Sequence, residues 1–472
     1  MKIVNPIIPQ KQIFYNTETN KIVPWKYNLS NKLDYKSIAE FMAIGFFLGN
    51  NTYYEDIKTC SPAKTYYLNN DKTIDRVESM WDWYYKPNQL TFNQNLDLFV
   101  DVFDKIINTQ TKDKDILLPL SGGLDSRTLF ASVRNRSNLK LCSYMFENGI
   151  NEVEYAKILS EKYNLPFFSE VIKKGYLWEK FDDLVKLNQC FTDFTHPRQA
   201  QVANKWKDIS STILLGHWGD VLFNSQIDNK KYSYDEQLLI LKNKIIKSDG
   251  LELASELWCN WGLQGSFESY LMDEIDQLYK KIDILNTSAR IRAFKSLYWA
   301  PRWTSINLSI FKTMGNLVLP YYDDNMCKLV CTIPEEYLNS RKIQIEYIKK
   351  TSPQVARVPW QKYHPFNLNN YQMFFNPIYL PVRLMKKIKR LTKSVFDDTY
   401  IITRNWENQF LGNTNRGLLK NKLLSNIGLD DILDKNLIKK YLSKFDKYPI
   451  KYSHSIGMLL TLSTFLNNRH NN

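Results

Sequence analysis

The chain has 472 residues, a formal net charge of +14, 44% hydrophobic residues and 14% aromatic residues. This composition excludes a disordered chain and predicts a folded enzyme with two or three domains. The positive charge is compatible with anionic ligands, nucleic acid or an acidic surface, and does not choose among them.

The cysteine pattern and the N-terminus indicate a cytoplasmic protein. None of the six cysteines has Cys-x-x-Cys spacing, and Cys327 and Cys331 lie in an apolar segment without nearby histidines. This pattern is typical of reduced thiols rather than of a metal site. The first residues lack a signal-peptide core, and no apolar run reaches membrane-spanning length. We therefore expect a cytoplasmic enzyme without a membrane span.

The N-terminal part reads as short strands and turns, with one helix from Tyr35 to Leu48 and an end near Pro87. An amphipathic helix follows, and its apolar face contains Leu96, Phe99, Val100, Phe103, Ile106 and Ile107. We expect domains over residues 1–92, 93–370 and 371–472.

The middle of the chain shows alternating strands and helices. Predicted strands span 116–120, 139–145, 167–172 and 212–215, with helices from Asp125 and over 152–163. Apolar strands separated by helical patterns predict an α/β fold with a doubly wound parallel sheet and flanking helices. Such sheets bind ligands at the carboxyl ends of their strands.

The last part is predicted to be helical. Residues 235–350 read as mostly helical, and the chain becomes basic and less regular after Pro365. The basic stretch 383–390 fits either a helix that contacts membrane or nucleic acid, or a solvated helix face, because its apolar side is narrow. We favour the solvated face.

The stretch that points most directly to chemistry is Ser121-Gly122-Gly123-Leu124-Asp125-Ser126. It follows a buried strand, turns through two glycines and opens a helix, which makes an anion cradle of free N–H groups. A carboxylate in such a cradle is intelligible as a ligand for Mg²⁺ that bridges phosphate oxygens. We therefore expect ATP and Mg²⁺ as ligands, with Asp125 on the metal.

Two further stretches carry candidate site residues. The strand that ends at Leu215 delivers Gly216, His217 and Asp220 to its carboxyl end, where Asp220 either ligates the same metal or caps a helix. Pro353 and Pro359 exclude a continuous helix, so a loop presents Lys362. This lysine either neutralises leaving pyrophosphate or is an ordinary surface lysine.

The order and spacing of these motifs, with Leu319-Pro320-Tyr321-Tyr322-Asp323, resemble the synthetase domain of the asparagine synthetase family, in the ATP-pyrophosphatase superfamily, over roughly residues 40–370. The resemblance implies that a carboxylate is adenylated by ATP and then attacked by ammonia or an amine. It further implies a pyrophosphate and metal site at Ser121, Gly122, Gly123, Asp125 and Ser126, a nucleoside pocket at Leu120, Met145 and Gly216, a second metal ligand at Asp220, and a transition-state cation at Lys362.

The departures from the family are informative. Lys2 stands where the family's glutaminase cysteine is expected, so residues 1–92 are interpreted as a remnant of the glutaminase domain. Ammonia or an amine would then come from solution or from a separate glutaminase. His217 replaces an acidic residue and is either a base for the amine, titrating near neutrality, or a structural substitute packed against Trp218.

The sequence predicts an ATP-dependent, AMP-forming amide ligase. Asn316 and Val318 replace the charged pair expected for aspartate, so the acid is aspartate or a larger acid, such as a sugar acid or peptide acid. Arg198 is a candidate for pairing with its carboxylate, against an ordinary exposed arginine. A tRNA-modifying enzyme and a catalytically silent relative are the alternatives; without an RNA-binding motif, we do not expect nucleic acid.

Overall fold

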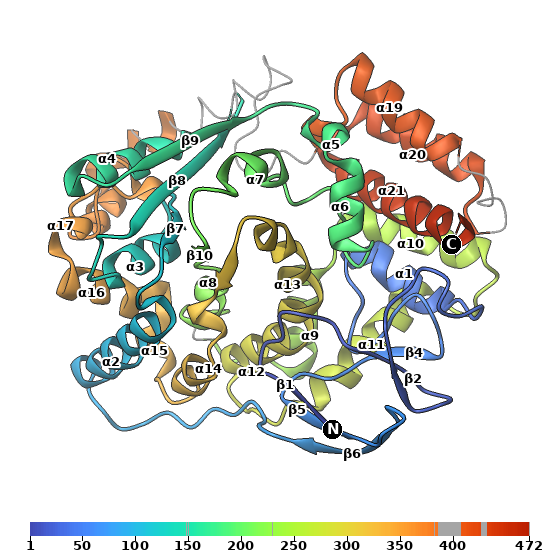
Figure 1. Ribbon diagram of the computed structural model, residues 1–472, viewed down its shortest axis with the longest axis horizontal. Coiled ribbons are helices and arrows are strands. Elements are labelled where there is room, and N and C mark those ends of the chain that lie inside the picture. Colours follow the sequence, from blue (N-terminus) through green and yellow to red (C-terminus); the bar gives the residue numbers. More distant parts are fainter. Residues whose placement is uncertain are drawn as a thin grey trace.

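The computed structural model describes residues 1–147, 149, 151–228, 230–381, 383–385, 407–425 and 432–471. Its N-terminal part contains two small antiparallel sheets and one helix (Figure 1). These elements are β1 (Lys2–Asn5), β2 (Phe14–Asn16), β3 (Lys21–Val23), α1 (Tyr35–Ile44), β4 (Ile57–Thr59), β5 (Lys64–Leu68) and β6 (Ile74–Ser79). Helix α1 is shorter than predicted because Gly45 adopts a left-handed conformation and ends it.

A five-stranded parallel sheet forms the centre of the molecule, in the order β11-β10-β7-β8-β9. Its strands are β7 (Ile116–Pro119), β8 (Leu139–Phe146), β9 (Phe167–Ile172), β10 (Thr212–Leu214) and β11 (Asn316–Val318). The strand order reverses between β7 and β10, which is where doubly wound sheets bind ligands. The predicted α/β fold class is confirmed.

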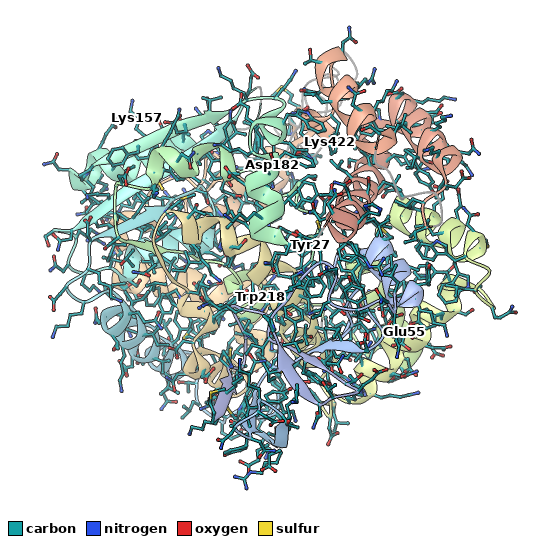
Figure 2. The ribbon with its side chains drawn as sticks, turned by 45° about the vertical axis from the view of Figure 1, so that its right-hand side comes forward. Tyr27, Glu55, Lys157, Asp182, Trp218 and Lys422 are labelled. Carbon is teal, nitrogen blue, oxygen red and sulfur yellow. The ribbon has the colours of Figure 1, made fainter. Side chains whose placement is uncertain are left out.

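Helices cover both faces of this sheet. Helices α3 (Leu124–Ser132) and α4 (Val153–Tyr163) lie on one side, and α7 (Ala200–Trp206) lies on the other (Figure 1). Helix α2 (Phe92–Thr111) begins at a capping box between Thr91 and Gln94 and buries its apolar face, as predicted. Side chains fill the interior between the sheet and the helices (Figure 2).

The region predicted as mostly helical is helical, with one exception. Strand β11 lies inside this region and pairs with β10. The sequence did not indicate β11, because it has only three residues and one of them is an exposed asparagine. The remaining elements up to residue 363 are α5 (Tyr176–Glu179), α6 (Phe181–Asn188), α8 (Gly219–Leu222), α9 (Tyr234–Ile245), α10 (Ser248–Asn260), α11 (Phe267–Lys280), α12 (Thr287–Phe294), the π-helix η1 (Lys295–Thr304), α13 (Ser305–Asn307), the 3₁₀ helices η2 (Leu308–Thr313) and η3 (Pro320–Tyr322), α14 (Asp324–Val330), α15 (Glu335–Leu338), η4 (Asn339–Arg341), α16 (Lys342–Thr351), α17 (Pro353–Ala356) and η5 (Gln361–Tyr363).

The C-terminal helices return to the N-terminal part of the chain. They comprise η6 (Tyr371–Phe375), η7 (Pro377–Tyr379), η8 (Glu407–Gln409), α19 (Asn413–Leu424), α20 (Lys435–Lys447) and α21 (Pro449–Asn471). In α21, the buried His454 Nε2 lies 3.0 Å from the Met42 carbonyl oxygen, and the Ser455 N–H donates to Asp249 Oδ2 at 2.8 Å. One hydrophobic core includes residues of all three predicted domains, so their boundaries stay a prediction.

None of the described helices combines the length and the apolar composition that crossing a bilayer requires. Of the basic stretch, Arg383, Leu384 and Met385 are described, whereas Ile388 and Leu391 lie outside the described residues.

Candidate functional site

The loop between β7 and α3 is held by its own serines. The Ser121 N–H donates to Ser126 Oγ at 3.1 Å, and the Gly123 N–H donates to Ser121 Oγ at 3.2 Å. Leu120 is buried, and its N–H donates to the Cys142 carbonyl at 2.8 Å, which continues the pairing of β7 with β8. The loop therefore has a fixed shape, with the first turn of α3 above it.

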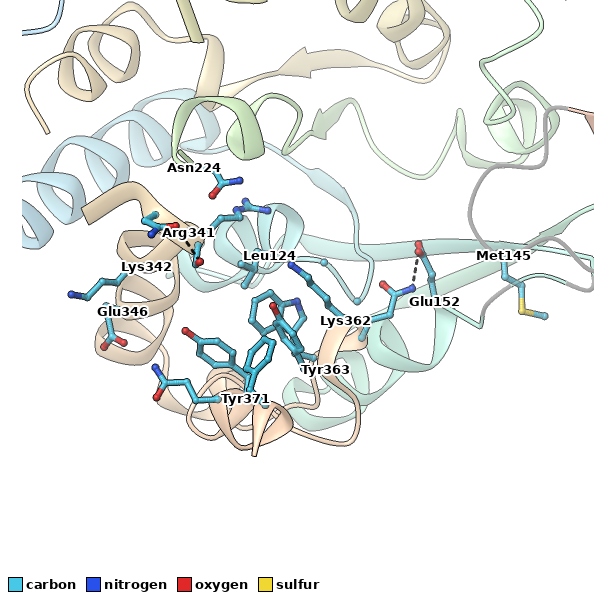
Figure 3. A pocket seen from close by; sticks show the side chains of 18 of the residues that line it. Leu124, Met145, Glu152, Asn224, Arg341, Lys342, Glu346, Lys362, Tyr363 and Tyr371 are labelled. Carbon is cyan, nitrogen blue, oxygen red and sulfur yellow. Dashed lines mark hydrogen bonds between the residues drawn. The ribbon is translucent and has the colours of Figure 1, made fainter. Parts of the chain in front are cut away.

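A cavity of about 1060 Å³ opens over this loop at the point where the strand order reverses. The predicted site residues that line it are Gly122, Gly123, Met145, Arg198 and Lys362. In Figure 3, Lys362 extends from η5 toward Leu124 at the start of α3, and Arg341 enters from the side of α16. Residues from four predicted stretches thus meet at one cavity.

The second glycine stretch packs directly against Asp125. A Cβ atom on Gly219 would lie 2.2 Å from Asp125 Oδ1 and 2.8 Å from the Tyr321 ring, so a larger residue there would displace these side chains. A Cβ on Gly216 would lie 3.0 Å from the backbone carbon of Asp125. Trp218, between them, has φ of 80°, a strained value for a bulky residue and typical of functional sites. The two strand ends therefore converge, although Gly216, His217 and Asp220 are not part of the cavity lining.

Asp125 is enclosed by partners that the sequence did not reveal. Arg341 Nη2 donates to its Oδ1, and Gln344 Nε2 donates to the same oxygen at 3.3 Å. Burial raises the pKa of Asp125 to about 6; the Arg341 guanidinium lowers it, and the nearby Asp220 carboxylate raises it further. Asp220 itself is exposed. The two carboxylates are close enough to repel each other, which is a situation that a bound cation relieves.

The residues present fit a magnesium ion that is also held by phosphate. Among the described residues there is no group of three or more His, Cys, Asp or Glu side chains arranged to hold a metal. Mg²⁺ is commonly bound by one or two carboxylates together with substrate phosphates and water. Asp125 and Asp220, converging beside the phosphate-binding type of loop, match that pattern.

The loop that carries Lys362 is fixed from two sides. Arg127, fully buried on α3, donates from Nη1 to the Val358 carbonyl at 2.9 Å and from Nη2 to the Pro359 carbonyl at 2.8 Å. Gln361 Nε2 donates to Glu152 Oε1 at 3.0 Å (Figure 3). Sequence reasoning missed these anchors; the signal for Arg127 was an arginine placed among the apolar residues of α3.

Gly122 meets the same loop. A Cβ atom on Gly122 would lie 2.5 Å from Gln361 Cβ and 2.9 Å from a ring carbon of Tyr155. The glycine therefore lets the Lys362 loop close over the Ser121 loop. Both loops contribute residues to the cavity lining.

Arg198 lines the cavity, as does Met145. Its guanidinium stacks over the Phe146 ring at 4.9 Å, and its buried Nη1 has no hydrogen-bond partner. An arginine with a free donor in a cavity is suited to pair with an anionic group. The structure thus places Arg198 inside the candidate site rather than on an open surface.

The surroundings of His217 favour the neutral imidazole. Burial lowers the pKa of His217 to about 4, and the neighbouring Asp220 only partly offsets this effect. Its ring lies 6.0 Å from the Phe311 ring, and its buried Nδ1 has no hydrogen-bond partner. At pH 7 His217 is a neutral imidazole.

Lys295 is a further cation near Asp220 that sequence reasoning missed. It begins the π-helix η1, a type of helix found frequently at functional sites. Burial lowers the pKa of Lys295 to about 8, and Asp220 raises it. Its Nζ donates to Gln226 Oε1 at 3.1 Å and lies 5.4 Å from the centre of the Trp299 ring.

Comparison with known proteins gives one family. Residues 99–270 match the asparagine synthase family, a segment that contains the Ser121 loop and the Gly216–Asp220 stretch and ends before Lys362. A comparison with curated proteins gave no match.

Two solved structures are similar to parts of the chain. NMN synthetase from Francisella tularensis is 12% identical, over 44% of this chain and 93% of that one, with a TM-score of 0.21. Glutamine-dependent NAD⁺ synthetase from Acinetobacter baumannii, in complex with ADP, is 10% identical, over 52% of this chain and 58% of that one, with a TM-score of 0.22. The family match covers residues 99–270 and agrees there with the resemblance to the asparagine synthetase family read from the motifs.

Proposed function

We propose that this chain is an ATP-dependent, AMP-forming amide ligase. The observation that carries the proposal is that Asp125 packs against Gly216 and Gly219 next to a cavity that Gly122, Gly123 and Lys362 line. The two glycine stretches lie in the segment that matches the asparagine synthase family. A phosphate-binding loop, two carboxylates and a lysine are the groups that phosphoryl and nucleotidyl transfer require.

The reaction has two steps. A carboxylate oxygen of the acid attacks the α-phosphorus of ATP, a new O–P bond forms, and the bond to the β-phosphate breaks to release pyrophosphate. Ammonia or an amine then attacks the activated carbonyl, the C–N bond forms, AMP leaves, and the nitrogen loses a proton.

Each residue has a proposed role in this scheme. The loop from Ser121 to Ser126 would bind pyrophosphate oxygens through the N–H groups that its own serines do not engage, and Lys362 would offset the charge of the leaving group. Met145, in the cavity lining, would contact the nucleoside together with Leu120 and Gly216 beside the cavity. Asp125 and Asp220 would hold Mg²⁺, which supplies neutralisation of phosphate charge when it is bound. His217, neutral at pH 7, would act on the amine only as a hydrogen-bonding group and not as a charged one.

The activated acid is proposed to be larger than aspartate. The cavity is wide, and aromatic side chains of Tyr363, Tyr371 and Phe375 line one wall of it. Phe375 is 55% exposed, which leaves an aromatic surface in the cavity lining. Together with Arg198, which also lines the cavity, these rings suit an anionic acceptor with an apolar face, such as a sugar acid or a peptide acid.

The amine is proposed to come from outside the chain. Burial raises the pKa of the Cys60 thiol to about 12, so this cysteine is protonated and a poor nucleophile. A neutral buried thiol does not support hydrolysis of glutamine at that position. Free ammonia, a larger amine or a separate glutaminase would then supply the nitrogen.

The test is ATP–pyrophosphate exchange with labelled pyrophosphate, across aspartate, uronic acids and peptide acids. We expect at least one acid to support exchange, AMP to accumulate when ammonia is added, and Asp125→Asn to abolish both. Formation of ADP in place of AMP with every acid that is turned over would overturn the proposal.

A further inference from the structure

Arg341 forms an ion pair with Asp125 inside a short network of hydrogen bonds. Arg341 Nη2 donates to Asp125 Oδ1, and Arg341 Nε donates to Gln344 Oε1 at 2.8 Å. Gln344 Nε2 in turn donates to the Tyr321 hydroxyl at 2.9 Å. Gln344 thus fixes the orientation of the Arg341 guanidinium. The guanidinium in turn is hydrogen-bonded to a carboxylate oxygen of Asp125, the residue that would hold the metal.

The same guanidinium faces the cavity. Arg341 lines it together with Gly122, Gly123 and Lys362, and the Arg341 side chain retains 16% exposure. The cavity lining also contains Arg198 and Lys342, so a phosphate bound over the glycine loop has several cationic side chains in the surrounding wall. Arginine binds phosphate through two parallel N–H donors, whereas lysine acts as a point charge.

The backbone at Arg341 has an energetically unfavourable conformation. Ser340 has φ of 53° and Arg341 has φ of 64°, both in the left-handed region that residues other than glycine rarely adopt. Arg341 is also the residue that precedes α16, where the positive end of the helix dipole disfavours a cation. Strain and unfavourable charge at one residue point to a function for it, since neither contributes to stability.

We propose that Arg341 is an exchangeable cation, which neutralises Asp125 in the absence of metal and binds polyphosphate oxygens when a divalent metal takes its place on Asp125. The proposal deepens the proposed function, because it names a second residue that binds the pyrophosphate part of the substrate. It assigns opposite effects to one side chain: Arg341 opposes binding of metal alone and favours binding of metal together with polyphosphate.

The experiment measures binding without turnover. Mn²⁺ serves as the metal probe, followed by electron paramagnetic resonance, and inorganic pyrophosphate with Mn²⁺ serves as the anion probe, followed by calorimetry. For Arg341→Gln we expect Mn²⁺ alone to bind about tenfold more tightly and pyrophosphate about tenfold or more weakly, as loss of a charge-assisted contact predicts. Arg341→Lys keeps the charge and should regain part of the pyrophosphate affinity.

Two controls isolate the contact. Lys350→Gln removes one positive charge from the other end of α16, where Lys350 is exposed and pairs with Asp97, and it should change neither affinity. In an Asp125→Asn background, Arg341→Gln should no longer raise Mn²⁺ affinity, because the contact that opposes the metal is already lost.

Weakening of both affinities in Arg341→Gln would overturn the proposal and make Arg341 a structural residue. Unchanged affinities would overturn it as well. If Arg341→Gln does not fold, the pyrophosphate affinities of Arg341→Lys and the wild type are compared instead. Equal affinities of these two proteins would contradict an arginine-specific contact with pyrophosphate. Since Mn²⁺ and pyrophosphate binding need no acid and no adenylation, failure of the exchange assay leaves this test intact.

Discussion

Arg127 Nη1 lies 2.9 Å from the Val358 carbonyl oxygen, and this bond joins the helix after the glycine loop to the loop that carries Lys362. Because both Arg127 donors in this contact go to consecutive carbonyls, Arg127 sets where Lys362 stands without contacting substrate. It is a positioning residue.

The first prediction concerns Arg127. Arg127→Lys keeps a charge but cannot reach both carbonyls, and displacement of a catalytic group by about 1 Å can cost about 10²-fold in rate. We expect kcat for exchange to fall toward that extent while KM for ATP changes little. The kinetics should be measured with the unfolding temperature of each variant. Loss of ATP affinity with kcat unchanged would contradict the positioning role.

The second prediction concerns Lys362. Its charge is proposed to act on the leaving pyrophosphate, so Lys362→Gln should lower kcat by about 10²- to 10³-fold, the usual effect of removing one donor that stabilises developing charge. Lys157→Gln, at an exposed lysine of α4, is the matched control and should leave kcat unchanged. Pre-steady-state measurement of AMP formation tests this; equal rates in wild type and Lys362→Gln would exclude the role.

The third prediction concerns His217. Since burial lowers its pKa to about 4, its protonation does not change between pH 6 and 8. His217→Gln should therefore keep the shape of the pH–rate profile over this range, whatever its effect on the absolute rate. Disappearance of an ionisation near pH 6.5 in the variant would show that His217 titrates as a base near neutrality.

The fourth prediction concerns stability and Glu40, which is fully buried on α1 and accepts a hydrogen bond from the Tyr270 hydroxyl at 2.9 Å. Burial raises the pKa of Glu40 to about 8; the Tyr270 bond and Asn51 lower it, and Glu274 and Asp34 raise it. The folded state therefore holds a proton that the unfolded state releases near its ordinary value of 4.5.

The stability that this protonation contributes is full below the unfolded pKa and is lost as the pH rises through about 8. The free energy of unfolding should fall by up to about 1.4 kcal/mol per pH unit in this window because of Glu40. We would measure the free energy of unfolding by urea denaturation at several pH values. Its decrease with pH should be smaller in Glu40→Gln than in the wild type, whereas Glu78→Gln, at an exposed position, should behave as the wild type does. Identical slopes in wild type and Glu40→Gln would refute the assignment.

The sheet and the phosphate loop were predictable because their signals are local. Apolar runs such as Leu117 and Leu118 mark buried strands, and the two glycines after them mark the turn. Strand β11 was not predictable, since its three residues include the exposed Asn316 and their pairing with β10 is a long-range contact.

The partners of the site were not predictable for a related reason. Arg341 is separated from Asp125 by 216 positions, and Arg127 from Val358 by 231. Nothing in the local sequence of α3 tells which carbonyls a buried arginine will meet. The motifs thus indicated which residues carry the chemistry, whereas the residues that orient them required the fold.

The central claim is that a carboxylate oxygen attacks the α-phosphorus of ATP. The most direct measurement uses the acid that supports exchange, labelled with oxygen-18 in its carboxylate, and follows the label by phosphorus NMR and mass spectrometry during amide formation. We expect one labelled oxygen in each AMP released. Label in inorganic phosphate, with ADP as the nucleotide product, would contradict the claim.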